Sequence, residues 1–244
     1  MAKQIFDSNS KEPFWISRTK IDLFLECPRC FYLDRKFGLR RPSMPAFSLN
    51  DAVDNLLKKE FDLLRKNGDA HEIMKKYGIE AVPFQHPDLP EWRDDFHKYL
   101  GAYVVHRKTN FKVSGIVDDI WVNEKKELFI VDYKSTSTSK EISLNDQYKE
   151  SYKKQMEVYQ WIFRQKGFNV SDVGYFVFAN ATKNRPKFDG KLEFELSIIE
   201  YEGNDFWVEK TLIDAKKCLL KKEIPAPSPT CEYCDYFEQR EKML

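Results

Sequence analysis

The sequence predicts an α/β fold in which helices flank a mixed β-sheet. The first observation is a change of period, because apolar residues recur at helical spacing near both ends and alternate with polar residues in the middle. The second is the order of the segments, which runs helix, hairpin, helix, strand, strand, helix. That order is typical of an α/β protein with a mixed sheet.

The N-terminal segments are expected to be helical. Ser17 is a plausible N-cap for a helix that runs to Phe31 and is ended or kinked at Pro28. A second amphipathic helix is predicted over Leu49–Asn67, where Gly68 stops it. Breakers at one glycine and three prolines make His71–Leu100 a stretch of short helices and loop.

The middle and C-terminal segments alternate between strands and helices. Phe111–Val122 and Leu128–Lys134 read as two strands joined by the polar turn Asn123–Glu127. The elements expected after a Ser/Thr-rich loop at Ser135–Leu144 are a helix at Asp146–Gln165, strands at Gly174–Asn180 and Leu192–Glu200, and a helix at Phe206–Lys222. Three alternate prolines then lead to Cys231.

Composition excludes several classes of protein. The 244 residues carry 40 Lys and Arg against 39 Asp and Glu, a net charge of +1, so the chain does not coat nucleic acid through overall charge. No apolar run is long enough to span a bilayer, and Met1–Asp7 lacks the apolar stretch of a secretory signal. We therefore expect a cytoplasmic protein without a membrane partner.

The hairpin carries the informative acids. If its turn is centred on Lys125, Asp118 faces Asp132 across the two strands, with Cβ atoms roughly 5 Å apart. Two carboxylates that close repel one another unless a cation lies between them. Lys134 projects from the same face as Asp132, and Asp119 from the other face. A one-residue shift in the turn would exchange Asp118 and Asp119.

Such a group suits phosphodiester hydrolysis. Hard carboxylate oxygens favour Mg²⁺ or Mn²⁺, which can stabilise charge on a phosphate and lower the pKa of an attacking water. Lys134 could position that water or steady the developing negative charge. The simpler alternative is that Asp-x-Lys on a strand is common and that Asp119 is a solvated hairpin charge.

The combination of motifs resembles a known family. Gly115-Ile-Val-Asp118, Val131-Asp-Tyr-Lys134 and the pair Gln155 and Tyr159 on the next helix occur in the order found in the PD-(D/E)XK nuclease superfamily. More narrowly they are similar to the RecB-like group, which includes CRISPR-associated exonucleases. The resemblance implies a restriction-endonuclease-like core, a catalytic role for Gln155 and Tyr159, and the Tyr133 carbonyl as a further metal ligand.

Near the N-terminus, one feature matches this group and another departs from it. Cys27-Pro-Arg-Cys-Phe-Tyr32 matches an opening helix that this group often has. A later helix of the group contributes a His to the metal, and here Asp54 stands at that position. Asp54 could serve as an oxygen ligand, Glu60 is the fallback, and a solvated helix acid is the alternative.

The cysteines form two pairs. Cys27 with Cys30 and Cys231 with Cys234 are each CxxC, and two such pairs complete a tetrahedral thiolate site that joins the N- and C-terminal helical parts. Cys218 lies beside two leucines and is expected in the core. The resemblance implies a [4Fe–4S] cluster, although the group usually draws one Cys from the N-terminal side and three from the other. Zn²⁺ therefore remains open.

Basic residues with neighbouring aromatics suggest a nucleic-acid face. The candidates are Arg29, Arg35, Arg40, Lys183 and Arg185. Phe31, Tyr32, Phe37 and Phe188 lie beside them in the sequence, where they could stack bases or belong to the core. The hydroxyl-rich stretch Ser135–Ser139 could contact phosphates.

We therefore expect one nuclease domain over residues 1–244, with an N-terminal helical part (17–110), a sheet core (111–200) and a C-terminal helix with its cysteine pair (201–244). The predicted activity is Mg²⁺- or Mn²⁺-dependent DNA cleavage by an exonuclease acting on single strands or ends. The setting would be repair, recombination or CRISPR adaptation, with partners from such a complex. The alternatives are a catalytically silent nucleic-acid-binding or scaffold module and, last, a zinc-stabilised RNA-binding protein.

Overall fold

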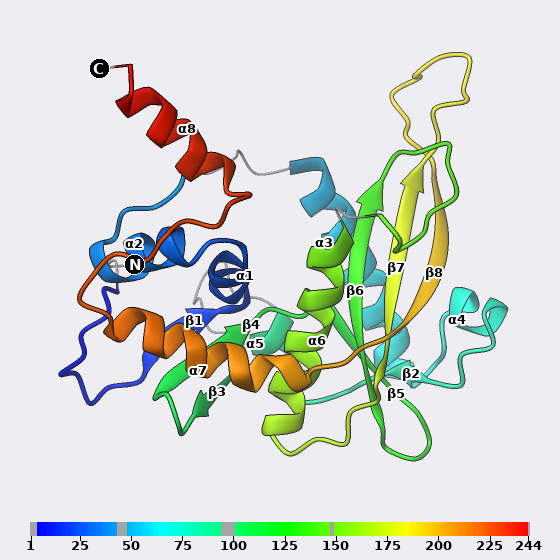
Figure 1. Ribbon diagram of the computed structural model, residues 1–244. Coiled ribbons are helices and arrows are strands. Elements are labelled where there is room, and N and C mark those ends of the chain that lie inside the picture. Colours follow the sequence, from blue (N-terminus) through cyan, green and yellow to red (C-terminus); the bar gives the residue numbers. More distant parts are fainter. Residues whose placement is uncertain (1–3, 43–47, 94–100, 147–148, 244) are drawn as a thin grey trace. The chain divides into compact units, whose positions relative to one another are not determined.

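The computed structural model describes residues 4–42, 48–93, 101–146 and 149–243. The chain forms two compact units (Figure 1). Unit 1 consists of the described residues of Met1–Pro45, Tyr103–Ser114 and Phe206–Leu244. Unit 2 consists of those of Ala46–Ala102 and Gly115–Asp205.

Unit 2 is built on a five-stranded mixed sheet with the order β2-β5-β6-β7-β8. The strands are β2 (Val82–Pro83), β5 (Asp119–Val122), β6 (Leu128–Thr136), β7 (Val173–Ala181) and β8 (Phe194–Glu202). Of these pairs, β6 and β7 run parallel, and β2–β5, β5–β6 and β7–β8 are antiparallel. The mixed sheet predicted from the element order is thereby confirmed.

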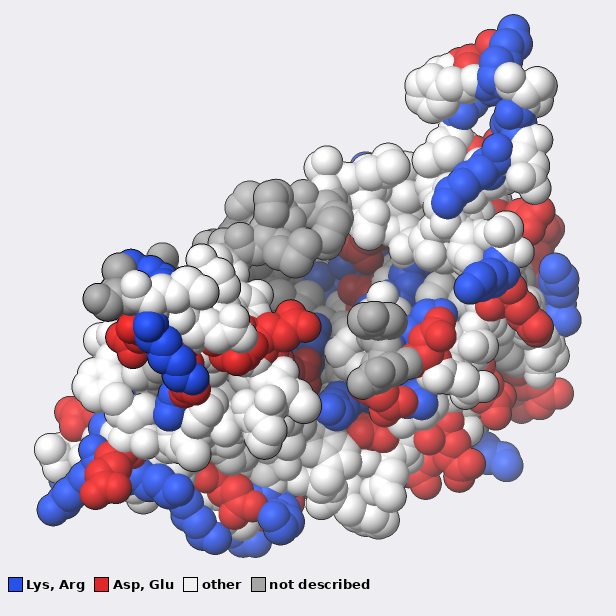
Figure 2. All heavy atoms as spheres, turned by 45° about the horizontal axis from the view of Figure 1, so that its top comes forward, with Lys and Arg blue, Asp and Glu red and all other residues white. Residues whose placement is uncertain are grey.

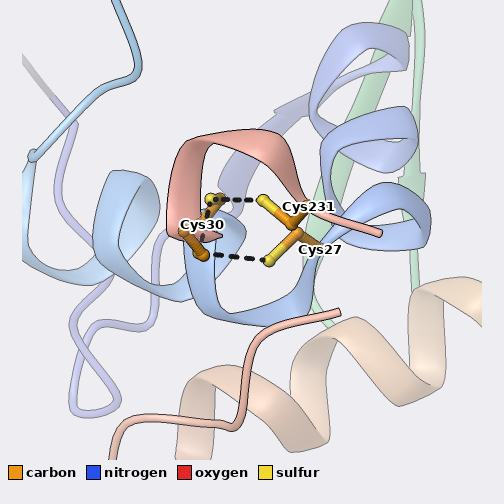
Figure 3. A group of neighbouring side chains, drawn as sticks. Cys27, Cys30 and Cys231 are labelled. Carbon is orange, nitrogen blue, oxygen red and sulfur yellow. Dashed lines mark hydrogen bonds between the residues drawn. The ribbon is translucent and has the colours of Figure 1, made fainter. Parts of the chain in front are cut away.

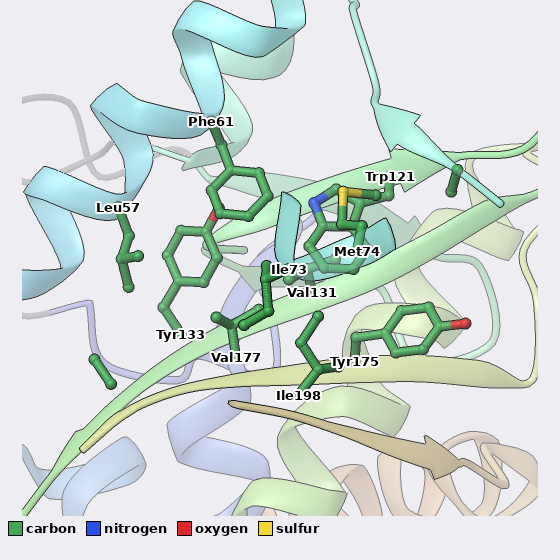
Figure 4. Packing of buried hydrophobic residues seen from close by; sticks show 12 residues of the cluster. Leu57, Phe61, Ile73, Met74, Trp121, Val131, Tyr133, Tyr175, Val177 and Ile198 are labelled. Carbon is green, nitrogen blue, oxygen red and sulfur yellow. The ribbon is translucent and has the colours of Figure 1, made fainter. Parts of the chain in front are cut away.

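Helices cover both faces of this sheet. Leu57 and Phe61 of α3 (Ser48–Asn67) and residues of α4 (Glu72–Lys76) pack on the face that carries Trp121, Tyr133 and Val177 (Figure 4). Phe61 stacks on Trp121 with ring centroids 5.6 Å apart. The other face is covered by α6 (Glu150–Gln165). A short helix, α5 (Leu89–Arg93), completes the described part of the unit.

A glycine of β7 makes room for a side chain of α6. A Cβ atom on Gly174 would lie 2.4 Å from the sulfur of Met156, so a larger residue there would force the methionine side chain to move. The alternating apolar residues of β6 and β7 thus fill two different cores, one under each helical layer.

Unit 1 contains a three-stranded sheet in the order β1-β4-β3. Its strands are β1 (Phe14–Ser17), β3 (Ala102–His106) and β4 (Phe111–Gly115), with β1 and β4 parallel. The unit also contains α1 (Arg18–Glu26), α2 (Pro28–Phe37), α7 (Phe206–Leu220) and α8 (Glu232–Glu241). The phenol of Tyr32 in α2 donates to the carbonyl of Lys221, 2.9 Å away, and ties α2 to the end of α7.

One expectation about these elements is wrong, and the expectation that Pro28 ends the first helix is confirmed. Phe111–Val122 is not one strand, because β4 and β5 belong to different sheets and are separated by Ile116–Asp118. Pro28 does end the first helix, but it also occupies the first position of α2, where a missing N–H costs nothing. Strands β1 and β3 were not expected from the sequence.

The other boundaries are close to prediction. α6 begins at Glu150 rather than Asp146, with residues 147–148 outside the described part, and residues 94–100 of the expected loop are outside it too. The predicted N-terminal part is divided between the two units, and the single nuclease domain stays a prediction. No helix in the described ranges is long and apolar enough to cross a membrane.

Candidate active site and four-cysteine centre

The β5–β6 hairpin has the predicted register. Asp119 pairs with Val131 and Val122 with Leu128, which centres the turn on Lys125. Asp118 lies just before β5, and its Oδ2 accepts a hydrogen bond of 2.8 Å from the backbone N–H of Tyr133. The side chain of Asp118 is thereby held against the stretch of β6 that carries Asp132 and Lys134.

Asp132 is fully buried and is surrounded by donors. Its Oδ1 accepts a hydrogen bond of 2.7 Å from Nε2 of Gln155, and its Oδ2 is ion-paired with Lys134. A buried carboxylate would be costly without such partners. The Asp-x-Lys motif and the helix that follows it therefore meet in one cluster.

Gln155 joins the motifs of strand and helix. Its Nε2 lies 3.1 Å from the hydroxyl oxygen of Tyr159, one turn later on α6, and its Oε1 lies 3.5 Å from Nζ of Lys134. Because residues i and i+4 share one helix face, both side chains project from α6 toward β6. The structure thus brings together four of the predicted residues: Asp132, Lys134, Gln155 and Tyr159.

The charges of two acids keep Lys134 protonated. Burial disfavours the ammonium form, but the carboxylates of Asp132 and Asp118 outweigh it, so the pKa of Lys134 lies above its ordinary value. Its Nζ also lies 4.6 Å from the ring centroid of Tyr152, a cation–π contact. Lys134 is therefore an ammonium group at neutral pH.

Asp54 is also part of this site. Its Oδ2 accepts from Nζ of Lys58 at 2.7 Å, and the same Nζ lies 3.7 Å from Oδ1 of Asp118. Burial and the neighbouring charge of Asp118 raise the pKa of Asp54, against the opposing effect of Lys58. Glu60, the fallback ligand, instead pairs with His71 at 2.9 Å.

A second acid lies behind the site. Asp119 is fully buried and accepts from Arg65 at 2.6 Å and from the hydroxyl of Tyr133 at 2.8 Å. It projects from the opposite face to Asp132, as predicted, but it is not a solvated hairpin charge. The sequence analysis missed Arg65 and Lys58. The available signal for Arg65 was its position one turn after Phe61, on the buried stripe of α3.

The side chains present fit a hard divalent cation. Asp54, Asp118 and Asp132 offer carboxylate oxygens. Lys58 and Lys134 pair with these acids and supply positive charge at the site. Among the described residues, the three carboxylates are not as tightly gathered as the cysteines described next.

The four cysteines meet in unit 1. Their Sγ atoms all lie within 4.8 Å of one another and point toward a common centre (Figure 3). Cys30 lies 3.6 Å from Cys231 and 3.5 Å from Cys234, and Cys27 lies 3.8 Å from Cys234. Cys218 is buried elsewhere in α7, as expected. The four thiols can hold a metal, as predicted, and link α2 to α8.

The surroundings shift the pKa values of the thiols in opposite directions, since burial raises the pKa of Cys30 and of Cys234. Burial alone would raise the pKa of Cys27, but backbone N–H groups of Cys30 and Ser228 lower it to about 7. The guanidinium of Arg41 lies 3.2 Å from Sγ of Cys231 and 4.5 Å from the ring centroid of Tyr233. These donors lower the free-energy cost of negative charge in the centre.

The basic residues have different surroundings. Arg35 is 7% exposed and donates to the carbonyls of Gln4 and Trp15, which favours a structural role. Arg29 bonds the carbonyl of Pro225 and the carboxylate of Glu238, and Arg40 is exposed. The aromatic residues Phe31 and Tyr32 are fully buried, so they cannot stack bases.

Lys183 lines a pocket at the carboxyl ends of the parallel strands β6 and β7. The pocket encloses about 360 Å³ and is lined by Thr138–Glu141, Asn180–Asn184 and Glu195. Asn180 closes its base by exchanging hydrogen bonds with the backbone of Thr138. Two candidate stretches, Ser135–Ser139 and the Lys183 segment, therefore share one polar pocket.

Further basic residues follow on the loop between β7 and β8. Arg185 pairs with Glu193, Lys187 pairs with Asp189, and Phe188 between them is 73% exposed. Figure 2 shows Lys and Arg side chains gathered on this projecting loop. An exposed aromatic among cations is the arrangement that stacks bases of a single strand.

A protein-family model matches most of the chain. No curated protein matches the chain. A solved structure described as "Crystal structure of SSO0001" shares 14% identity over 95% of this chain and 87% of that chain, with a TM-score of 0.38. The family model of the PD-(D/E)XK nuclease superfamily matches residues 16–239, which include both cysteine pairs and the whole acidic site. The chain therefore belongs to the PD-(D/E)XK nuclease superfamily.

Proposed function

We propose that this protein is a Mg²⁺- or Mn²⁺-dependent deoxyribonuclease of the RecB-like group. The observation that carries the proposal is the set of contacts around Asp132, whose buried carboxylate meets Lys134 and Gln155 and lies next to Asp118 on one hairpin. A buried acid paired in this way inside a nuclease fold is what metal-assisted phosphodiester cleavage requires.

The acidic residues and the lysine of the site would have different roles. Asp118, Asp132 and the Tyr133 carbonyl would hold the ion, with Asp54 as a further oxygen ligand, and the ion would supply Lewis acidity toward the phosphate and the attacking water. Lys134, which is ion-paired with Asp132, would donate a hydrogen bond to that water or to the developing anion. Gln155 and Tyr159 hold Asp132 and Lys134 in place.

The substrate we propose is single-stranded DNA or a DNA end. The polar pocket begins four residues beyond Lys134, at most about 13 Å along an extended strand, so its hydroxyl, amide and Lys183 groups could contact a neighbouring phosphate. Phe188 offers a stacking surface next to Arg185. Repair, recombination and CRISPR adaptation all supply such ends, and the protein would act there in the cytoplasm with partner proteins.

The test is cleavage of end-labelled single- and double-stranded DNA with Mg²⁺ or Mn²⁺, and with EDTA as the blank. Asp132→Asn and Lys134→Ala should each lower the rate by at least about 100-fold. Lys125→Ala, at the exposed turn of the same hairpin, should cleave like the parent protein. Wild-type rates in Asp132→Asn or Lys134→Ala protein would refute the proposal.

The same assay separates the rival functions. DNA binding that weakens with salt, without cleavage under any metal, would identify a catalytically silent module instead. Cleavage of RNA but not DNA would keep the nuclease and overturn the substrate. Degradation from a free end, compared between linear and circular single strands, would establish exonuclease action.

We propose that the cysteine centre holds a single Zn²⁺ ion. Four thiolates at the usual Zn–S distance of about 2.3 Å lie about 3.8 Å apart in a tetrahedron. Three of the six Sγ–Sγ separations in this centre are 3.5, 3.6 and 3.8 Å, and all six are within 4.8 Å. In a [4Fe–4S] cluster each thiolate binds a different iron, which holds the sulfurs farther apart. The spacing therefore supports zinc over the cluster implied by the resemblance.

Protein purified without oxygen tests this choice. A colourless protein with one zinc per chain is expected. A brown protein with broad visible absorption and stoichiometric iron and sulfide would overturn the zinc assignment and restore the cluster.

A further inference from the structure

Lys58 lies inside the candidate metal site. It follows Asp54 by one helical turn on α3, and its side chain is 18% exposed. Its Nζ lies 2.7 Å from Oδ2 of Asp54 and 3.7 Å from Oδ1 of Asp118. One ammonium group thus bridges two carboxylates that come from different elements, α3 and the segment before β5.

The bridge has an electrostatic reason. Two carboxylates in a partly buried site repel one another, and a positive charge between them removes the repulsion. In this structure the ammonium group of Lys58 provides that positive charge.

A divalent ion that bound the two oxygens that Lys58 contacts, Oδ2 of Asp54 and Oδ1 of Asp118, would need the space that its ammonium group occupies. Mg²⁺ binds carboxylate oxygens at about 2.1 Å, closer than an ammonium group approaches them, and two cations cannot share one position. The ammonium group of Lys58 must leave before the ion can contact both oxygens. Its unbranched side chain allows that movement.

We propose that Lys58 is a built-in cation that competes with the divalent metal for Asp54 and Asp118. It stabilises the metal-free site and sets the metal concentration at which the site fills. This inference rests on the proposed metal-dependent function and adds a control on metal binding to it.

Direct metal binding tests the competition without measuring cleavage. Free Mn²⁺ is titrated by electron paramagnetic resonance at fixed pH and ionic strength, without DNA, into protein that keeps its cysteine centre. Lys58→Met should bind Mn²⁺ about tenfold more tightly than the parent protein, since it removes a unit charge at contact distance. Lys59→Met removes the same charge from an exposed position on the same helix and should leave the Kd unchanged.

Three further variants complete the test. Lys58→Arg keeps the charge and should bind Mn²⁺ about as weakly as the parent protein, and Lys58→Gln replaces Lys58→Met if the latter does not fold. Asp118→Asn shows whether Mn²⁺ binds at this site, because the substitution removes a proposed ligand and should abolish binding there.

If Mn²⁺ binds in an Asp118-dependent way but with the same or lower affinity in Lys58→Met and Lys58→Gln, the competition is refuted while the nuclease proposal stands. If no variant shows Asp118-dependent binding, the metal site itself is refuted.

Discussion

The ring of Tyr159 lies directly against Gly115. A Cβ atom built on Gly115 would fall 2.4 Å from Cε1 and 2.8 Å from Cδ1 of that ring. The glycine that opens Gly-Ile-Val-Asp therefore makes room for the tyrosine that ends the Gln155–Tyr159 pair. Two motifs separated by about forty residues in sequence are thus coupled by one contact.

The first prediction follows from this contact. Gly115→Ala should destabilise the protein by about 1–3 kcal/mol, since a methyl group is forced against a packed ring. It should also lower the cleavage rate, because Tyr159 and Gln155 must shift. Denaturant unfolding and the cleavage assay measure the two effects.

A double-mutant cycle provides the control. In a Tyr159→Ala background the ring is gone, so adding Gly115→Ala should cost much less free energy than it does alone. Equal costs in the two backgrounds would show that the contact with Tyr159 is not the cause.

The second prediction concerns the buried acid behind the site. Asp119→Asn leaves the guanidinium of Arg65 without its buried partner and should cost about 3–5 kcal/mol of unfolding free energy. Asp62→Asn removes another partner of Arg65 that is 45% exposed and should cost under about 1 kcal/mol. Similar losses in the two variants would contradict the account of the Arg65–Asp119 pair.

The third prediction separates positioning from folding. Gln155→Ala removes the hydrogen bonds to Asp132 and Tyr159, and we expect a rate about 10–100-fold lower with little change in Tm. Gln165→Ala, at an exposed position of the same helix, is the matched control and should retain full activity. A normal rate in Gln155→Ala would remove this residue from the site.

The fourth prediction is a pH dependence. Burial acts to raise the pKa of Asp62, but hydrogen bonds and charges from Arg93 and Arg65 outweigh it and leave the pKa below its ordinary value. A carboxyl with a depressed folded-state pKa contributes stability above its unfolded pKa of about 4 and loses it as the pH falls through the folded value. The Tm difference between the parent protein and Asp62→Asn should therefore be full at pH 7 and shrink below about pH 4. A difference that stays constant down to pH 3 would exclude this role.

The fifth prediction concerns the cysteine centre. Cys231→Ser should lose the bound metal and lower the Tm, because α8 is then no longer fixed to α2 through the thiolates. Cys218→Ser should keep the metal. Limited proteolysis should cut near α8 only in the metal-free protein, and equal resistance with and without metal would argue against a structural role.

The sequence by itself determined the local features of this protein. A turn centred on Lys125 predicted the register that β5 and β6 have, and a slip by one residue would have exchanged Asp118 and Asp119. Helical periodicity located α3, α6 and α7, and two CxxC pairs located the thiolate centre. Each of these signals spans a few neighbouring residues.

The tertiary structure alone decided which distant groups meet. Nothing local to Lys58 indicates Asp118, and nothing local to Arg65 indicates Asp119, since each pair forms only when α3 packs on the sheet. The same holds for the division of Phe111–Val122 between two sheets and for the burial of Arg35. The backbone of a helix or strand sets the face on which each of its side chains lies. The packing of elements far apart in the chain sets which partner a side chain meets, and hence its charge environment.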